Sequence, residues 1–189
     1  YFEGFAQYMK KENEAALQTF KKGVAQIKPD SDPNIVSDFY AVMGDILHEK
    51  GLEKQAFEAY DSCLHWRPDN LSALNNYAYY LSLTKSDLKK AELMSYKTIK
   101  KEPTNSTFLD TYAWILFLQG RYEEANTYIE QAIKNDSTPS GTLFEHAGDI
   151  YYQAGKPEAA LEAWQKALQL GNNSATLRKK INLKKYIPE

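Results

Sequence analysis

The chain has 189 residues and a formal net charge of −2 at pH 7. Its residues are 43% hydrophobic and 25% charged, and this composition excludes a disordered chain. A single cysteine, Cys63, excludes an intrachain disulfide, and no apolar stretch reaches the length of about 18 residues that a membrane span needs. Basic residues gather in 174–189, so the rest is acidic, which argues against nucleic-acid binding.

Two series of small residues recur along the chain at intervals of 34 or 35 residues. The first series is Gly44, Ala78, Ala113 and Gly148, and the second is Ala56, Ala91, Ala125 and Ala160. Such a period is typical of arrays in which each repeat is one supersecondary unit packed only on its neighbours. The sequence therefore predicts an all-α solenoid of antiparallel helix pairs, all in one domain.

Residues 1–36 are expected to form a partial first repeat. Gly4 and Tyr8 mark its first helix, and Ala16 and Phe20 mark its second. The segment 28–34 holds two prolines among turn-forming residues, so we expect a loop there.

The second repeat, 37–70, has amphipathic spacing in both helices, with Gly51 as the cap between them and Asn70 as the cap of the next helix. The third, 71–105, has Thr84–Asp87 in place of the turn glycine and Ser95 at the usual aromatic position. We expect it to be the most loosely packed repeat.

The fourth and fifth repeats are expected at 106–139 and 140–174, with Pro157 in the first turn of a helix, where its missing N–H costs nothing. A capping helix is predicted over 175–187 within a final segment 175–189, and Pro188 would end it. Its basic residues would form the polar outer side of a helix that covers the last apolar face of the array. Alternatively, they would bind an acidic partner or an anionic surface.

Signals for catalysis and cofactors are absent from the sequence: it has no G-x-S-x-G, no phosphate-binding glycine loop and no H-E-x-x-H. Asp45 with His48, and His146 with Asp149, have i,i+3 spacing, but two ligands do not make a metal site. We expect no enzyme activity, catalytic residue, cofactor or metal. The N-x-S/T sequences that begin at 70, 105, 135 and 172 are interpreted as helix caps.

The repeat resembles the tetratricopeptide repeat. The last repeat carries the pattern most fully, in Phe144, Ala147, Gly148, Tyr151, Gly155, Ala160, Trp164 and Ala167, although Asn172 replaces the closing proline. The resemblance implies a right-handed superhelical solenoid with a C-terminal capping helix. It also implies a protein-binding scaffold whose first helices line a concave groove.

In that family the ligand contacts come from residues three before, one after and four after the small residue of each first helix, which share one helical face. Applied here, the resemblance gives Asp45, His48, Asn75, Tyr79, Asp110, Trp114, Phe117, Glu145, Asp149 and Tyr152, with Ala41 and Ser82. This set is acidic and aromatic, so it favours a basic or mixed polar-apolar segment over an acidic peptide. Alternatively, the carboxylates are solvated and the aromatic rings pack on neighbouring helices.

The stretches 73–81 and 109–125 are similar to bacterial tetratricopeptide proteins of the cell envelope, including lipoprotein adaptors. That resemblance implies an exported protein, lipid-anchored through residues that precede this sequence, with the cytoplasm as the alternative. Three functions stay open: a protein-binding adaptor, a self-associating structural module that forms a homo-oligomer, and a binding module of a longer protein whose enzymatic domain lies outside this sequence.

Overall fold

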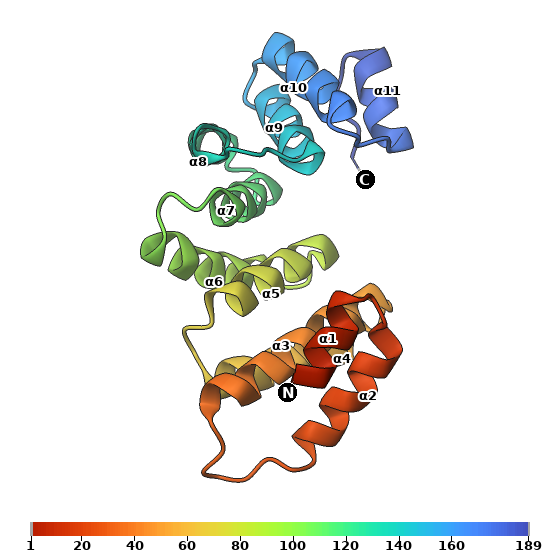
Figure 1. Ribbon diagram of the computed structural model, residues 1–189. Helices are drawn as coiled ribbons and strands as arrows, with labels where there is room; N and C mark the ends of the chain where they lie inside the picture. Colours follow the sequence, from red (N-terminus) through yellow and green to blue (C-terminus); the bar gives the residue numbers. More distant parts are fainter. Residues whose placement is uncertain (1, 189) are drawn as a thin grey trace. The chain divides into compact units, whose positions relative to one another are not determined.

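The computed structural model describes residues 2–188, and every regular element in that range is a helix (Figure 1). The helices are α1 (Phe2–Met9), α2 (Asn13–Val24), α3 (Pro33–Glu49), α4 (Glu53–Trp66), α5 (Leu71–Thr84), α6 (Leu88–Lys101), α7 (Ser106–Leu118), α8 (Tyr122–Asn135), α9 (Gly141–Gln153), α10 (Pro157–Gln169) and α11 (Ala175–Leu183). The all-helical class is therefore confirmed. None of the described helices has the length and apolar character that crossing a membrane requires.

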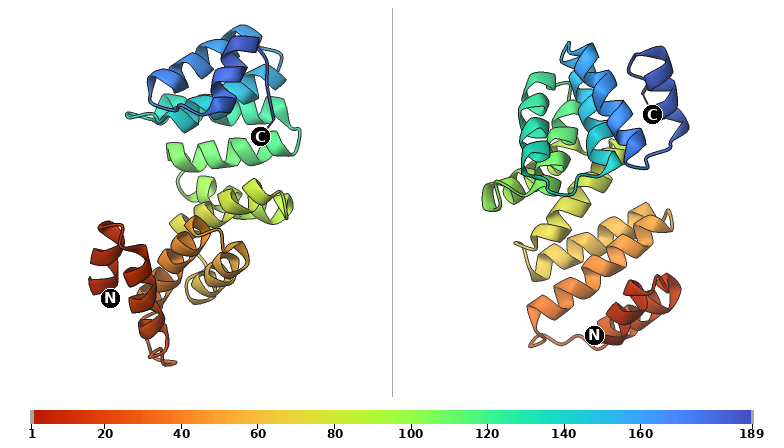
Figure 2. Two further views of the ribbon diagram at one scale, coloured as in Figure 1. Left: turned by 90° about the vertical axis from the view of Figure 1, so that its right-hand side faces the viewer. Right: turned by 45° about the horizontal axis from the view of Figure 1, so that its top comes forward.

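The chain divides into two compact units, and α5 contributes to both. Unit 1 is Tyr1–Tyr80 and unit 2 is Leu81–Glu189. In unit 1, α1 packs on α2, α2 on α3, and α3 on α4, as the paired ribbons in Figure 2 show. Its core includes Leu17, Phe20 and Ile46, which are almost completely buried.

Unit 2 repeats the same packing through α6 to α11. Each of these helices packs against the next one along the chain, and α7 also contacts α9. Because α7 and α9 are the first helices of consecutive pairs, their contact places one face of each on the same side of unit 2. We call this the first-helix face; the opposite face is formed by the second helices α8 and α10.

Side-chain caps fix several helix starts. The side-chain oxygens of Asp32, Asp87, Asn105, Ser140 and Ser174 accept hydrogen bonds from backbone N–H groups in the first turn of the helix that follows each. Asn70 accepts a bond from the N–H of Ala73 at 3.2 Å. The cap interpretation of the N-x-S/T sequences is thus confirmed at Asn70 and Asn105, and at the sequence that begins at 172 through Ser174, whereas the side chain of Asn135 bonds the carbonyl of Gln131.

Glycines in the repeat position allow the second helix of a pair to approach the first. A Cβ atom placed on Gly44 would lie 2.8 Å from the Tyr60 ring, and one on Gly148 would lie 2.3 Å from the Trp164 ring. Real Cβ atoms do not approach other atoms so closely, so alanine is excluded where the facing side chain is this large. The repeat position is therefore glycine where the second helix places a large aromatic ring against it.

Two predicted boundaries differ in the structure. α3 begins at Pro33, inside the segment predicted as a loop, because Asp32 caps the helix and proline suits its first turn. α11 ends at Leu183 and not before Pro188, because Lys184 takes a left-handed conformation with φ of 50° and the N–H of Lys185 bonds back to the carbonyl of Lys180.

Candidate functional site

Among the predicted binding residues of unit 1, Asp45 on α3 forms a hydrogen-bonded cluster with residues of α4 and α5. Asp45 Oδ1 accepts hydrogen bonds from the hydroxyl of Tyr60 and from Nδ2 of Asn76, the latter at 3.1 Å. Burial raises the pKa of Asp45, although these two hydrogen bonds oppose the shift. Asp45 therefore serves as an internal acceptor that ties α3 to α4 and α5, and its side chain is only partly exposed.

His48 lies beside this cluster, with its ring stacked on that of Tyr80 at 3.6 Å between centroids. Its Nδ1 is buried and has no hydrogen-bond partner among the described residues. Tyr79 contacts Tyr80 in turn, with centroids 6.0 Å apart, and Asn75 is buried on α5. The aromatic residues of this part of the surface thus include Tyr80, which does not occupy any of the three positions that the family resemblance selects.

In unit 2, four rings form a continuous row along the first-helix face, which we call the aromatic row. It consists of His146, Trp114, Phe117 and Tyr186. His146 stacks on Trp114 at 4.2 Å, Trp114 stacks on Phe117 at 4.9 Å, and Tyr186 meets Phe117 edge to face at 5.6 Å. Such offset-stacked and edge-to-face arrangements are the favourable geometries for aromatic pairs. Two of the four rings were predicted as ligand contacts.

Asp110 holds one end of this row, since its Oδ1 lies 2.9 Å from Nδ1 of His146. Burial lowers the pKa of His146, but the charge and hydrogen bond of Asp110, with the charges of Asp149 and Glu145, outweigh burial and raise it above 6.5. Folding therefore stabilises the protonated form of His146 relative to the unfolded chain, through its pairing with the Asp110 carboxylate.

This shift predicts a pH-dependent stability. A raised histidine pKa stabilises the folded state fully below the unfolded value of about 6.5, and the contribution is lost as pH rises through the folded value. Replacing His146 with asparagine should therefore cost more unfolding free energy at about pH 5.5 than at about pH 8.5. Urea titrations at both pH values measure it, with His65→Asn as a control for losing an exposed histidine. An equal cost at both values would contradict the assignment.

Lys180 of α11 is completely buried between two predicted ligand residues of α9. Its Nζ lies 2.9 Å from Glu145 Oε1 and 2.7 Å from Asp149 Oδ2. The other Asp149 oxygen accepts from Nε1 of Trp164 at 2.9 Å, and the other Glu145 oxygen accepts from Asn172 at 2.6 Å. We call Glu145, Asp149 and Lys180 the lysine site.

Burial raises the pKa of Asp149 to about 6, against the opposing effects of Lys180 and the Trp164 hydrogen bond. At neutral pH its carboxylate is paired and covered, as is that of Glu145. The structure therefore differs from the expectation that both offer charge to a ligand. The prediction that the basic residues of the capping helix face outward is wrong for Lys180, because its ammonium group compensates two buried carboxylates.

Asp45 and Asp149 occupy equivalent positions, each directly after the repeat glycine. Both accept a hydrogen bond from the aromatic ring that the glycine admits, Tyr60 in one repeat and Trp164 in the other. In the two repeats between them the small residue is alanine, and Tyr79 and Trp114 follow it. The residue after the small one is thus a packing partner in two repeats and a surface aromatic residue in the others.

A small cavity of about 150 Å³ opens on the first-helix face of unit 2. Trp114, Leu118, Asp149 and Tyr186 line it, together with Ser82, Leu83 and Lys85 from the end of α5 and the following turn. The indole N–H of Trp114 is buried without a hydrogen-bond partner in residues 2–188. An unpaired buried donor is costly, so binding of an acceptor to this N–H would be favourable.

Tyr152, the remaining predicted contact, packs on Trp164 with centroids 5.8 Å apart.

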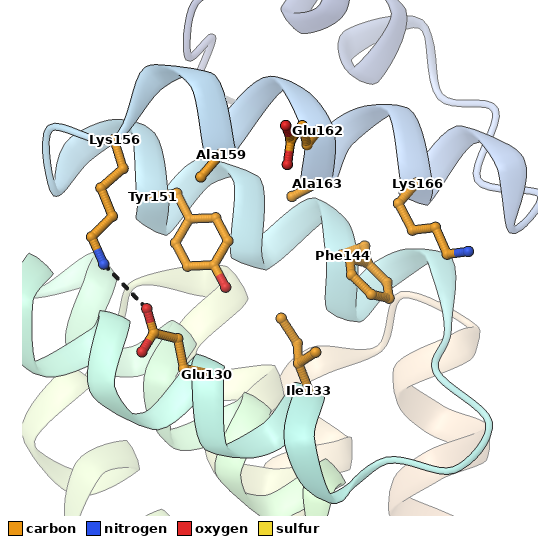
Figure 3. Close-up of a pocket in the computed structure, with 9 residues that line it drawn as sticks. All are labelled: Glu130, Ile133, Phe144, Tyr151, Lys156, Ala159, Glu162, Ala163 and Lys166. Carbon is orange, nitrogen blue, oxygen red and sulfur yellow. Dashed lines mark hydrogen bonds and ion pairs between the residues drawn. The ribbon is translucent and has the colours of Figure 1, made fainter.

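A larger hollow of about 510 Å³ lies among α8, α9 and α10 (Figure 3). Ile133, Phe144 and Tyr151 form its apolar floor, and Lys156 bonds Glu130 at its edge at 3.1 Å. Glu162 and Lys166 complete a rim with equal numbers of acidic and basic groups. This balance gives the hollow no preference for a ligand of either charge.

Within the described range, no group of three or more His, Cys, Asp or Glu side chains could hold a metal.

Models of the tetratricopeptide repeat match residues 37–70, 108–139 and 143–174, which together make up more than half of the chain. The chain belongs to the tetratricopeptide repeat family. Tetratricopeptide repeat proteins generally mediate protein–protein interaction, and the solenoid class predicted from the sequence is confirmed.

The similar tetratricopeptide proteins include bacterial ones. The type IV pilus assembly protein PilF of Pseudomonas aeruginosa is 26% identical over 80% of this chain, which spans 60% of that protein. The human tetratricopeptide repeat protein 13 is 30% identical over 68% of this chain and 15% of its own length. The chain thus spans at most about 60% of the length of these curated relatives.

Solved structures share the fold at low sequence identity. A structure of P. aeruginosa PilF has a TM-score of 0.73 at 17% identity and covers 96% of this chain and 85% of that one. MamA from Desulfovibrio magneticus RS-1 has a TM-score of 0.71 at 18% identity, over 90% and 93% of the two chains. At such identities the match establishes the tetratricopeptide solenoid architecture alone.

Proposed function

We propose that this chain is a non-catalytic scaffold that binds a segment of a partner protein on the first-helix face of unit 2. The observation that carries the proposal is the aromatic row, in which Phe117 stacks on Trp114, Trp114 stacks on His146, and His146 pairs with the Asp110 carboxylate. Aromatic anchors surrounded by polar groups are typical of the centres of protein interfaces.

The chemistry of this face favours a basic or mixed polar-apolar segment. The lysine site already holds one ammonium group of the chain itself, and the Asp110 carboxylate pairs with the His146 ring at the end of the row. The unpaired indole N–H of Trp114 would donate a hydrogen bond to a backbone carbonyl of the bound segment. His48, Asn75 and Tyr79 are proposed separately, as partner contacts of unit 1 by itself.

The match to a pilus assembly protein supports a place at the bacterial cell envelope, because pili are assembled there. We propose this location for the chain, with a lipid anchor on preceding residues as part of the same proposal. Self-association and service as the binding module of a larger enzyme are the competing functions.

The test is a double substitution, Asp110→Lys with Trp114→Ala, which reverses the charge and removes the central ring. Capture of partner proteins from a lysate of the source cell should fall about tenfold or more, as expected for a binding hot spot. The matched control, Glu162→Lys with Tyr151→Ala, makes the same kinds of change at the hollow of Figure 3. If capture survives the first pair unchanged while circular dichroism shows a folded chain, the proposed face is wrong.

A further inference from the structure

The segment that follows α11 turns back onto the first-helix face of unit 2. Lys184 is left-handed, and the N–H of Lys185 bonds the carbonyl of Lys180 at 3.2 Å, which closes the helix. A helix that continued through residue 186 would carry the Tyr186 ring onward along the axis of α11. The turn instead places this ring against Phe117 of α7, two helix pairs earlier in the chain.

Tyr186 contacts both the first-helix face and α11. Its ring meets Phe117 edge to face at 5.6 Å, and Lys180 Nζ lies 5.8 Å from its centroid. It also lines the cavity that Trp114 and Asp149 border. The last ring of the aromatic row is therefore supplied by the segment that follows α11, on the face that the proposed function assigns to a partner.

The attachment of Tyr186 differs from that of α11. Lys180 is completely buried and paired with two carboxylates, so α11 is held firmly. Tyr186 and Ile187 are only partly buried, and Lys184, Lys185 and Pro188 are exposed. Partly exposed residues outside a helix open more readily than a helix that is held by a buried ion pair.

We propose that Tyr186 is a resident ligand of the aromatic row, and that a partner segment binds by inserting its own aromatic side chain in the place of this ring. Residues 184–188 then compete with the partner and lower its apparent affinity. The occupant is an aromatic side chain because the vacated place is bounded by Phe117, Trp114 and the Lys180 ammonium group. This inference rests on the proposed function and specifies the anchor that the segment carries.

A labelled synthetic peptide with the sequence of residues 182–188, Asn-Leu-Lys-Lys-Tyr-Ile-Pro, is the probe. Fluorescence anisotropy measures its affinity for the full chain and for Tyr186→Ser. In Tyr186→Ser the place of the tyrosine ring in the aromatic row is empty. This variant should therefore bind the peptide about tenfold more tightly than the original chain, because the competing ring is gone. Ile187→Ser, at a neighbouring and similarly exposed position, should bind it as the original chain does.

A second peptide, with serine in place of tyrosine, should bind none of these proteins. Equal affinity of the tyrosine peptide for the original chain and Tyr186→Ser, including no measurable binding to either, overturns the inference. The two proposals fail separately. If Tyr186→Ser gains affinity but Asp110→Lys with Trp114→Ala captures partners unchanged, the tail is a resident ligand of a face that partners do not use.

Discussion

Replacing Lys180 with methionine is expected to lower the free energy of unfolding of unit 2 by about 3–5 kcal/mol. The substitution keeps much of the side-chain volume but leaves the carboxylates of Glu145 and Asp149 buried without their cation. Uncompensated buried charge is among the most costly changes in a folded protein. Urea unfolding followed by tryptophan fluorescence and circular dichroism measures the loss.

Lys179→Met provides the matched control, since Lys179 is the exposed neighbour of Lys180 on α11. Its effect should stay within about 0.5 kcal/mol, as is usual for surface substitutions. Adding Glu145→Gln and Asp149→Asn to Lys180→Met should recover part of the stability, because the buried charges are then gone. A loss below about 1 kcal/mol for Lys180→Met would show that the lysine site contributes little.

Replacing Trp164 with alanine is expected to cost about 3–5 kcal/mol, the range for removing a large buried ring. Trp164 is fully buried, packs against Gly148 and donates its indole hydrogen to Asp149. The variant therefore creates a cavity and removes a hydrogen bond from a buried carboxylate. Thermal and urea unfolding measure the effect.

Trp164→Phe helps to separate the two contributions, because it removes the N–H donor and keeps an aromatic ring that fills most of the same space. It should lose about 1–3 kcal/mol, the cost of an unsatisfied buried acceptor. Leu93→Ala on α6 is the control for truncating an apolar side chain that is 67% exposed. A Trp164→Ala variant as stable as Leu93→Ala would contradict the packing described for the last repeat.

The pairing of the helices was predictable from the sequence, because every repeat needs small residues at the same positions where its two helices pack together. A small residue in the first helix and an alanine in the second recur at nearly constant spacing, and each must face a neighbouring helix. The end of α11 was not predictable from the same pattern. Lys184 adopts a left-handed conformation and Tyr186 makes a tertiary contact with Phe117, and helical periodicity carries no signal for either.

The site was predictable in part. Trp114 and Phe117 lie in one aromatic row, as the family rule implies for residues that share a helical face. Glu145 and Asp149 differ, since their charges are neutralised by a lysine of another helix. A signal for this pairing exists in the sequence, because Asn75, Asp110, Glu145 and Lys180 follow one another at intervals of 35 residues. Lys180 therefore occupies the first-helix position of a sixth, incomplete repeat.

The pairing of glycine and aspartate also had a recognisable basis. Gly44 with Asp45 and Gly148 with Asp149 occur where the second helix carries Tyr60 or Trp164, whose polar hydrogen needs an acceptor. Where the second helix carries Ile129, the corresponding residues are Ala113 and Trp114. The polar requirement of the buried ring, and not a ligand, explains the carboxylate in the first two cases.

The central claim is that partners bind the first-helix face of unit 2, and photo-crosslinking tests it most directly. A benzophenone amino acid at Leu83, which is 45% exposed and lines the small cavity, is compared with the same amino acid at Tyr151, which lines the hollow of Figure 3. Crosslinks to captured partners are expected from position 83 and should be lost with Asp110→Lys and Trp114→Ala. Crosslinks from position 151 alone would contradict the account.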